Sequence, residues 1–284
     1  YFPNALDHVR MLFQAGHPVI GVCAAGILVR AVAPVLADKL SEPPLIAIPD
    51  DGSTVIPLLG GHHGANRLAK RIAEVLGGHA AVTTAGDVAL GVALDEPPAG
   101  WRLKNPEDAK SVMMAMLSGE DPIIEGENIW GLTSGKGPVR LVTSEAPTDA
   151  GADVLVYHPQ RFVLGLGCAR GCDPAEMWKL VSRALSEGNI APEAVACVAS
   201  LDLKGDEPAM IETAKRLGVP YRLFDADALE TETSRLLNPS DVVFAEVGCH
   251  GVSEAAALSS AGLEAVLVVE KRKTANATCA IAHS

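Results

Sequence analysis

Length and charge narrow the kinds of protein that this sequence can encode. The chain has 284 residues, more than one hydrophobic core usually organises, so two domains are expected. The net charge is −12, and no Lys/Arg cluster of the kind that tracks nucleic acid occurs, which argues against nucleic acid or anionic lipid as partners. An acidic small molecule remains compatible with this charge, provided that a local basic pocket overrides the global field.

The lengths of the apolar runs and the positions of the cysteines bear on where in the cell the protein is found. No apolar run approaches the roughly 20 residues that a membrane-spanning helix needs. The six cysteines lie mostly inside apolar runs, as reduced cysteines do, so a cytoplasmic protein is expected. The C-x3-C spacing of Cys168 and Cys172 does not match a zinc knuckle, and no metal is predicted. The sequence begins at Tyr1 without an initiator methionine or signal-peptide pattern, which we interpret as an excised piece of a longer protein.

Residues 1–95 are expected to form an amino-terminal α/β domain. Its apolar periodicity predicts strands at 18–23 and 80–85, two β-rich runs within 43–59, and helices at 27–39 and 66–78. Asp51-Gly52, between the two β-rich runs, favours a hairpin with a type I′ turn.

A linker module is expected at 96–160, where prolines and glycines flank a short helix at 110–120. Residues 140–145 and 153–158 within it resemble a strand pair.

Residues 161–284 are expected to form a second α/β domain. Strands are predicted at 162–168, 194–200, 221–225, 242–248, 265–271 and 277–282, and helices at 173–188, 206–218 and 253–262. This alternation predicts an α/β fold class, with two domains of mostly parallel sheets flanked by helices and joined by a small middle segment.

The stretch LLGGHHGAN (58–66) places two histidines in a glycine-rich turn before a helix. Glycines let the backbone approach a ligand, and a helix N-terminus favours an anion. His62 or His63 could then exchange a proton near neutral pH. The alternative is that Asn66 or Gly64 simply caps the helix while both histidines are solvated.

Polar residues follow three predicted strands of the second domain. GLGCARGC (165–172) lacks the glycine spacing of a dinucleotide fingerprint, but Arg170 could reach a carboxylate, and Asp173 is expected to cap a helix. The other two stretches present Asp202, Lys204, Asp206 and Glu207, and His250, Ser253 and Glu254. These lie where open α/β sheets bind ligands, or they are ordinary capping residues, with Gly251 and Ser253 as turn and cap.

Several motifs together resemble one family. CAAGILVRAVAPVLADK (23–39), LLGGHHGAN and TTAGDV (83–88) resemble the amino-terminal region of cobalt-precorrin-5A hydrolases of cobalamin biosynthesis. GLGCARGC, LDLKGDE (201–207), VGCHGVSEAAAL (247–258) and the closing VVEKRK…CAIA resemble the family's carboxy-terminal domain, which also exists alone as CobE. The resemblance covers nearly all the chain from about residue 18, with the first βα unit truncated. The histidine loop departs from the commoner S-G-H-x-G-G-A-N form, with Gly60 for serine and one glycine fewer before Ala65.

The resemblance implies hydrolysis of the ring-A δ-lactone of a corrin precursor, with release of acetaldehyde. Such a reaction needs a base to deprotonate water and a donor for the developing oxyanion, and the histidine loop beside a helix N-terminus offers both. The catalytic residues implied are His62, His63 and Asn66. The substrate-binding residues implied are Arg30, Lys39, Arg67, Arg170, Asp202, Lys204, Glu207, His250, Ser253, Glu254 and Lys271.

No cofactor is implied, since any cobalt arrives within the substrate. The expected partner is a corrinoid pathway intermediate, and some members of the family are fused to a precorrin-3B C(17)-methyltransferase, which would explain the missing initiator methionine. The competing hypothesis is a non-catalytic corrinoid carrier or scaffold that serves such a methyltransferase.

Overall fold

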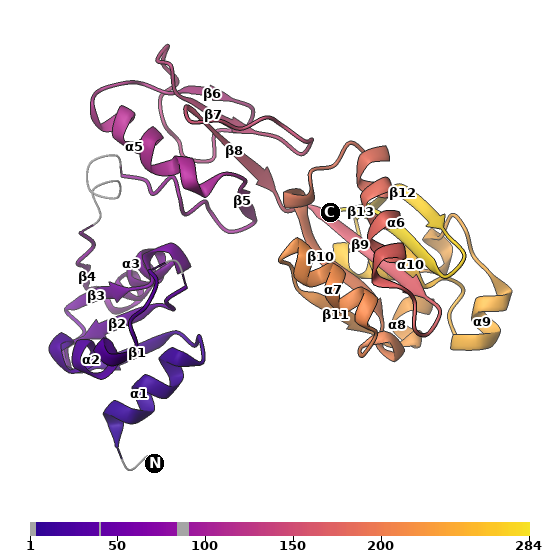
Figure 1. The fold of residues 1–284 in the computed structure, drawn as a ribbon, viewed down its shortest axis with the longest axis horizontal. Helices are drawn as coiled ribbons and strands as arrows, with labels where there is room; N and C mark the ends of the chain where they lie inside the picture. Colours follow the sequence, from indigo (N-terminus) through magenta and orange to yellow (C-terminus); the bar gives the residue numbers. More distant parts are fainter. Residues whose placement is uncertain (1–3, 40, 84–90) are drawn as a thin grey trace. The chain divides into compact units, whose positions relative to one another are not determined.

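A computed structural model describes residues 4–39, 41–83 and 91–284 (Figure 1). The chain divides into two compact units, Tyr1–Glu96 with Met113–Gly119, and Pro97–Val112 with Glu120–Ser284. No helix within the described residues is long and apolar enough to cross a membrane.

The amino-terminal unit contains a four-stranded sheet in the order β1-β2-β3-β4. The strands are β1 (Val19–Val22), β2 (Leu45–Ile48), β3 (Thr54–Leu59) and β4 (His79–Ala80), and the helices are α1 (Ala5–Gln14), α2 (Ala25–Val32) and α3 (Ala65–Leu76). β1 pairs with β2 and β3 with β4 in parallel, whereas β2 and β3 are antiparallel.

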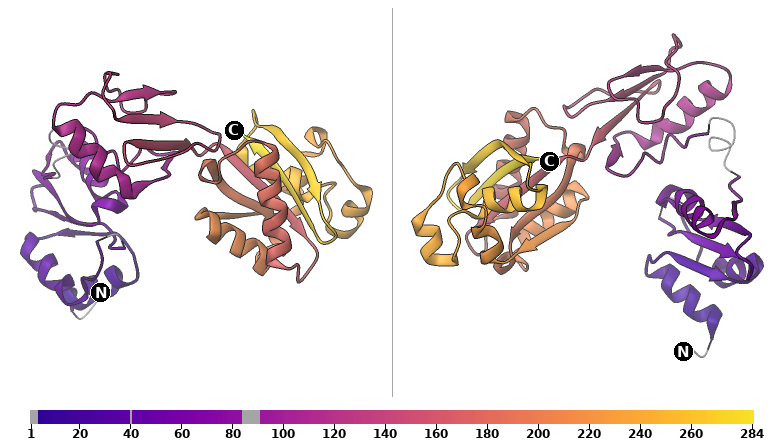
Figure 2. Two further views of the ribbon diagram at one scale, coloured as in Figure 1. Left: turned by 45° about the horizontal axis from the view of Figure 1, so that its top comes forward. Right: turned by 180° about the vertical axis from the view of Figure 1, so that it is seen from behind.

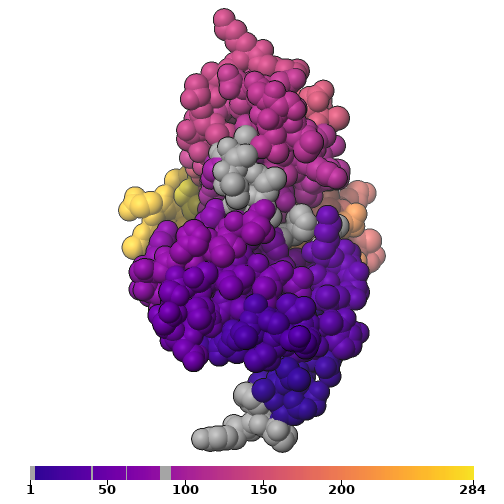
Figure 3. Space-filling model, turned by 90° about the vertical axis from the view of Figure 1, so that its left-hand side faces the viewer, coloured from indigo at the N-terminus to yellow at the C-terminus, as the bar shows by residue number. Residues whose placement is uncertain are grey.

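Strand β2 is buried on both faces, and this makes the unit three-layered. Leu45 and Ala47 pack with Phe13 of α1 and Leu28 of α2 on one face. Ile46 and Ile48, which point the other way because side chains alternate along a strand, pack with alanines of α3. Figure 3 shows one face of this unit as a space-filling surface, mainly in indigo and purple.

The predicted hairpin between β2 and β3 is present, but the type I′ turn is wrong. Five residues, 49–53, connect the strands, and Gly52 has a φ of +67°. A type I′ turn needs positive φ at both central residues, and Asp51 does not have it. Its carboxylate instead accepts a hydrogen bond from the Ser53 N–H at 3.0 Å, as in an Asx turn.

The middle segment carries a sheet of its own, in the order β5-β8-β7-β6. Its elements are β5 (Trp101–Leu103), α5 (Ala109–Leu117), β6 (Ile123–Glu125), β7 (Arg140–Thr143) and β8 (Val154–Pro159). β7 and β8 pair in parallel, which confirms the expected strand pair. The buried Asn105 side chain holds the segment together by bonding Asp108 and both the carbonyl of Val154 and the N–H of Val156.

The carboxy-terminal sheet has the order β11-β10-β9-β13-β12. Its strands are β9 (Phe162–Cys168), β10 (Val195–Leu201), β11 (Tyr221–Phe224), β12 (Val266–Lys273) and β13 (Ala277–His283). Its helices are α6 (Pro174–Glu187), α7 (Pro208–Leu217), α8 (Ala226–Glu230), α9 (Asp241–Val247) and α10 (Val252–Ala261). β9, β10 and β11 run parallel, and β13 is antiparallel to both β9 and β12. The predicted α/β fold class with mostly parallel sheets is therefore confirmed.

Helices cover both faces of this sheet (Figure 2). Residues of α6 and α7, including Met177 and Met210, pack with Leu164 and Leu166 of β9 on one face. Residues of α8 and α10, including Leu229, pack with Val163 on the other face.

Helix α10 approaches β9 unusually closely. A Cβ atom at Gly165 would lie 1.8 Å from the carbonyl oxygen of Ser253 and 2.7 Å from the N atom of Ala257. Glycine at this strand position, facing the small side chain of Ala257, lets the helix backbone contact the strand directly. The first turn of α10 is held in place by this contact.

The predicted strand at 242–248 is wrong, since these residues form helix α9. Ser240 caps the helix by accepting a hydrogen bond from the Val243 N–H, and Gly248 ends it with a φ of +81°. A short apolar run does not distinguish a strand from a helix by periodicity alone. The caps at both ends, together with exposed Val242 on a helix with no buried residue, decide for the helix.

A buried carboxylate ties α10 to its surroundings. Glu254, which is 1% exposed, accepts hydrogen bonds of 2.8–3.0 Å from the N–H groups of Leu237, Asn238 and Lys271 and from the Asn238 side chain. Burial raises the pKa of Glu254, but these donors outweigh it and hold the pKa below its ordinary value. The charged form of Glu254 therefore joins α10, β12 and the 237–238 loop.

We expect Glu254→Gln to lower the free energy of unfolding at pH 7 by about 3 kcal/mol, because a charged acceptor of several buried N–H groups is lost. Since the folded pKa is depressed, this stabilisation is present above the unfolded pKa of about 4.3 and disappears as the pH falls through the folded value. Urea unfolding at several pH values tests this. Glu212→Gln, at an exposed position of α7, is the control. An equal loss at pH 7 and pH 3 would contradict the assigned role.

Candidate functional site

The histidine loop connects β3 to α3 through a short 3-10 turn, Gly61–His63. Gly60 and Gly64, on either side of the turn, have φ values of +79° and +82°. His63 is exposed and Asn66 is buried, while the side chain of His62 lies outside the described part of the chain. The TTAGDV motif also falls outside the described residues from position 84 onward.

Gly60 cannot carry a side chain in this loop. A Cβ atom there would lie 2.5 Å from the backbone of Pro43 and Pro44. The positive φ adds to this strain for any other residue. The structure thus gives a physical reason for glycine where the commoner form of the loop has serine.

Gly64 occupies the N-cap position of α3, as one of the sequence interpretations expected. Glycine has no side chain to accept from the first-turn N–H groups, and within the described residues no side chain caps this helix. The turn therefore places His63 next to a helix start that is not capped by an acidic or hydroxyl side chain. That arrangement is compatible with an anion at the helix N-terminus.

The cationic residues predicted in this unit lie at separate positions on it. Arg30, in the last turn of α2, donates to the Gly26 carbonyl at 3.0 Å. Lys39 is exposed in the segment before β2, and Arg67 is exposed in the first turn of α3. Their role in substrate binding stays a prediction.

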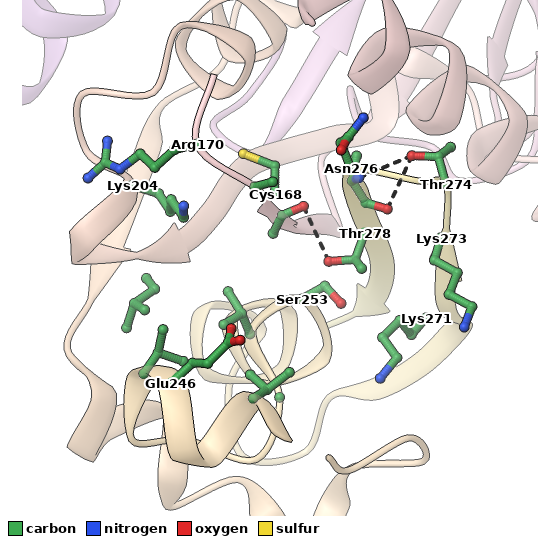
Figure 4. A pocket seen from close by; sticks show the side chains of 18 of the residues that line it. Cys168, Arg170, Lys204, Glu246, Ser253, Lys271, Lys273, Thr274, Asn276 and Thr278 are labelled. Carbon is green, nitrogen blue, oxygen red and sulfur yellow. Dashed lines mark hydrogen bonds between the residues drawn. The ribbon is translucent and has the colours of Figure 1, made fainter. Parts of the chain in front are cut away.

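A cavity of about 720 Å³ opens at one edge of the carboxy-terminal sheet (Figure 4). The ends of β9 and β10 meet the start of β13 and the end of β12 here, and α9 and the first turn of α10 complete the wall. This is the edge where open α/β sheets bind ligands. Apolar side chains such as Leu201, Val243 and Val247 line one part, and charged side chains line another.

The cavity brings together Arg170, Lys204, Ser253 and Lys271 of the predicted substrate-binding residues. It also contains Lys273, which the sequence interpretation missed although it ends the conspicuous KRK run. Among the described residues that line the cavity, Glu246 is the one carboxylate. Four cationic side chains thus face one carboxylate in a chain whose net charge is −12.

Arg170 is already engaged by neighbouring loops. Its guanidinium donates to the Asp206 carboxylate and to the Leu203 carbonyl, and it lies 3.5 Å from a carboxylate oxygen of Glu207. Asp206 raises the pKa of Arg170, and the hydrogen bond from Arg170 lowers the pKa of Asp206. The pair fixes the loop after β9 to the loop after β10.

Glu207 is buried, and its side chain does not cap a helix, unlike the alternative interpretation of the sequence. It occupies the N-cap position of α7, but its carboxylate accepts from the Gly171 N–H at 2.9 Å instead of capping the helix. Asp202, by contrast, is exposed and accepts from the Leu203 N–H. Asp173 caps α6 through the Ala175 N–H, as expected.

His250 and Glu254 lie beside the cavity without lining it. His250 stacks on Phe244 of α9 with ring centroids 4.4 Å apart, and its Nδ1 lies 2.8 Å from Glu230. These contacts anchor the segment that carries α9. The structure therefore shows both residues in supporting contacts, and a direct role for them in substrate binding stays a prediction.

Glu176 of α6 is a further residue that the sequence interpretation missed. Its carboxylate accepts from the Thr274 hydroxyl and from the N–H and side-chain amide of Asn276. The Thr274 bond, followed by those of Asn276, lowers the pKa of Glu176. These bonds hold the β12–β13 turn, and with it the rim of the cavity.

Cys168 lines the cavity, but its side chain stays a protonated thiol at neutral pH and is therefore a weak nucleophile. Burial raises the pKa of Cys168 to about 11, and the nearby Glu207 adds to the shift. Among the described residues, no group of three or more His, Cys, Asp or Glu side chains is arranged to hold a metal ion.

Comparison with known proteins identifies relatives along most of the chain. A family model described as Cobalamin synthesis G N-terminal matches residues 7–87, and one described as Cobalamin synthesis G C-terminus matches residues 162–282. Protein CobE of Sinorhizobium sp is 51% identical over 120 residues, which cover 42% of this chain and 78% of that protein.

Two longer relatives are both named cobalt-precorrin-5A hydrolase. The protein of Priestia megaterium is 29% identical over 96% of this chain and 81% of its own length. The protein of Salmonella typhimurium is 31% identical over 87% of this chain and 77% of its own length. With both family segments in the same order, this chain belongs to the cobalt-precorrin-5A hydrolase family.

Proposed function

We propose that this chain hydrolyses the ring-A δ-lactone of cobalt-precorrin-5A in cobalamin biosynthesis and releases acetaldehyde. The observation that carries the proposal is the similarity to relatives named cobalt-precorrin-5A hydrolase over 96% and 87% of the chain. The histidine loop supports it, since His63 is exposed on a turn between a strand and a helix start that no described side chain caps.

The loop offers the groups that lactone opening requires. A histidine acts as base and takes a proton from water, whose oxygen attacks the lactone carbonyl carbon. Backbone N–H groups at the start of α3 stabilise the negative charge that develops on the carbonyl oxygen. The ester C–O bond then breaks, which leaves a carboxylate on ring A and a hydroxyl on the bridging carbon.

Loss of the two-carbon fragment follows from that hydroxyl. When its proton is removed, the oxygen forms a carbonyl and the bond from the bridging carbon to the ring breaks. The electron pair of that bond passes to the macrocycle, which takes up a proton, and acetaldehyde leaves. A second proton transfer is therefore needed, and the neighbouring His62 and His63 form a pair that can provide both transfers.

The alternative of a non-catalytic carrier is not favoured, because the relatives that span most of the chain are named as hydrolases. A fused or associated precorrin-3B C(17)-methyltransferase stays a prediction, as does the cytoplasmic location. The cobalt of the substrate would arrive already bound in the corrin ring.

We expect His62→Ala or His63→Ala to lower the rate of acetaldehyde release by about 100-fold to 10,000-fold, as loss of a general base does. His63 is exposed, so its replacement leaves no core cavity and should change the free energy of unfolding by less than about 1 kcal/mol. Trapping acetaldehyde with a coupled dehydrogenase measures the rate, and thermal melts measure stability.

His17→Ala, at an exposed loop position of the same unit, is the matched control and should keep the parental rate. Asn66 is less suitable for this test, because it is buried and its replacement would also disturb folding. Full activity in both His62→Ala and His63→Ala would refute the catalytic assignment of the loop.

We also expect corrinoid binding to weaken as salt rises. The proposed substrate carries several acetate and propionate groups, and the carboxy-terminal cavity carries four cations. Titration of the full chain with cobyrinic acid at increasing sodium chloride measures this by absorbance. A dissociation constant that does not change with salt would argue against an electrostatic binding site.

A further inference from the structure

The first turn of α10 forms the floor of the carboxy-terminal cavity. Gly251, Val252 and Ser253 all line the cavity, and Gly251 is the N-cap residue. Glycine leaves the first N–H groups of this ten-residue helix without a side-chain cap among the described residues. Such a helix start carries partial positive charge and favours a negatively charged group.

Ser253 adds an independent sign of a missing ligand. The residue is 1% exposed, and its Oγ atom has no hydrogen-bond partner among the described residues. An unsatisfied buried hydroxyl is unfavourable, and native proteins usually provide a partner for it. Because Ser253 lines the cavity (Figure 4), a ligand in the cavity is the natural source of that partner.

Two lysines lie on the same side as Ser253. Figure 4 shows Lys271 and Lys273 at the end of β12, and Arg170 and Lys204 on the opposite side of the cavity. Lys271 Nζ donates to the Asn238 carbonyl at 2.7 Å, which positions it near the helix start. A negatively charged ligand group here would meet a helix dipole, a hydroxyl and ammonium groups together.

We propose that the start of α10, with Ser253 Oγ, Lys271 and Lys273, binds one carboxylate arm of the corrinoid substrate. This inference rests on the proposed function for the identity of the ligand. The apolar side chains of Val243, Val247 and Val252 face the less polar edge of the macrocycle. Lys204, across the cavity, balances a further acidic arm.

The test uses the full chain and two probes, cobyrinic acid with free carboxylates and its heptamethyl ester with none. We expect Ser253→Ala to weaken binding of the acid about 10-fold, which corresponds to about 1.4 kcal/mol for a hydrogen bond to a charged group. Lys273→Gln should weaken it about 3-fold at low salt and less at high salt. The ester should bind wild type more weakly than the acid, and neither substitution should change its binding.

The chain provides matched controls for both substitutions. Ser259, on the same helix, also has a buried Oγ without a partner among the described residues, but it does not line the cavity. Ser259→Ala should therefore bind cobyrinic acid as wild type does, and Lys179→Gln, exposed on α6, controls for Lys273→Gln. Neither serine hydroxyl has a described partner, so both alanine variants should melt at or above the wild-type temperature.

The outcomes separate this subsite from the proposed reaction. Equal binding by Ser253→Ala, Lys273→Gln and wild type would overturn the subsite, even if acetaldehyde release is intact. Selective loss in these variants would support it, even if the wild type releases no acetaldehyde, because cobyrinic acid binding does not require turnover. If Ser253→Ala fails to fold, the exposed Lys273→Gln variant decides the question.

Discussion

The close contact between α10 and β9 is the constraint on which the carboxy-terminal unit depends. It exists because Gly165 has no side chain where the carbonyl of Ser253 approaches the strand. Glu254, one residue later, binds N–H groups of the 237–238 loop and of Lys271. The strand contact and the buried carboxylate together fix the first turn of α10. This turn also lines the cavity, so the packing of α10 against the sheet determines the position of the cavity floor.

The cavity of the carboxy-terminal unit is locally basic although the whole chain is acidic. The chain has a net charge of −12, yet the cavity concentrates Arg170, Lys204, Lys271 and Lys273. Two buried carboxylates, Glu207 and Glu254, are turned toward N–H groups and do not line the cavity. These carboxylates accept hydrogen bonds from N–H groups and so stabilise the loops around the cavity, while the lining cations provide a basic surface for an anionic ligand.

The proposed reaction and the proposed binding of acidic groups use different elements of the fold. The histidine loop of the amino-terminal unit has glycines in left-handed conformations and an exposed His63 at a helix start. The carboxy-terminal cavity has cations, a buried hydroxyl and apolar walls but a Cys168 whose pKa of about 11 makes it a weak nucleophile at neutral pH. The amino-terminal loop thus offers groups for proton transfer, and the carboxy-terminal cavity offers groups that bind anions.

The sequence by itself determined the α/β class, the strands and helices with strong periodicity, and the family, because these depend on local patterns and motifs. It also located Arg170, Lys204 and Lys271 near strand ends, whereas Ser253 was placed after a predicted strand that is in fact helix α9. Only the tertiary structure decided that 242–248 is a helix, because a short apolar run suits either conformation until its caps and packing are set. It alone separated Ser253, whose hydroxyl lacks a described partner, from Glu254 and Glu207, whose carboxylates are used internally. The hydrogen-bond partners of Glu254 and Glu207 come from segments at least 16 residues away, so no local pattern can assign them.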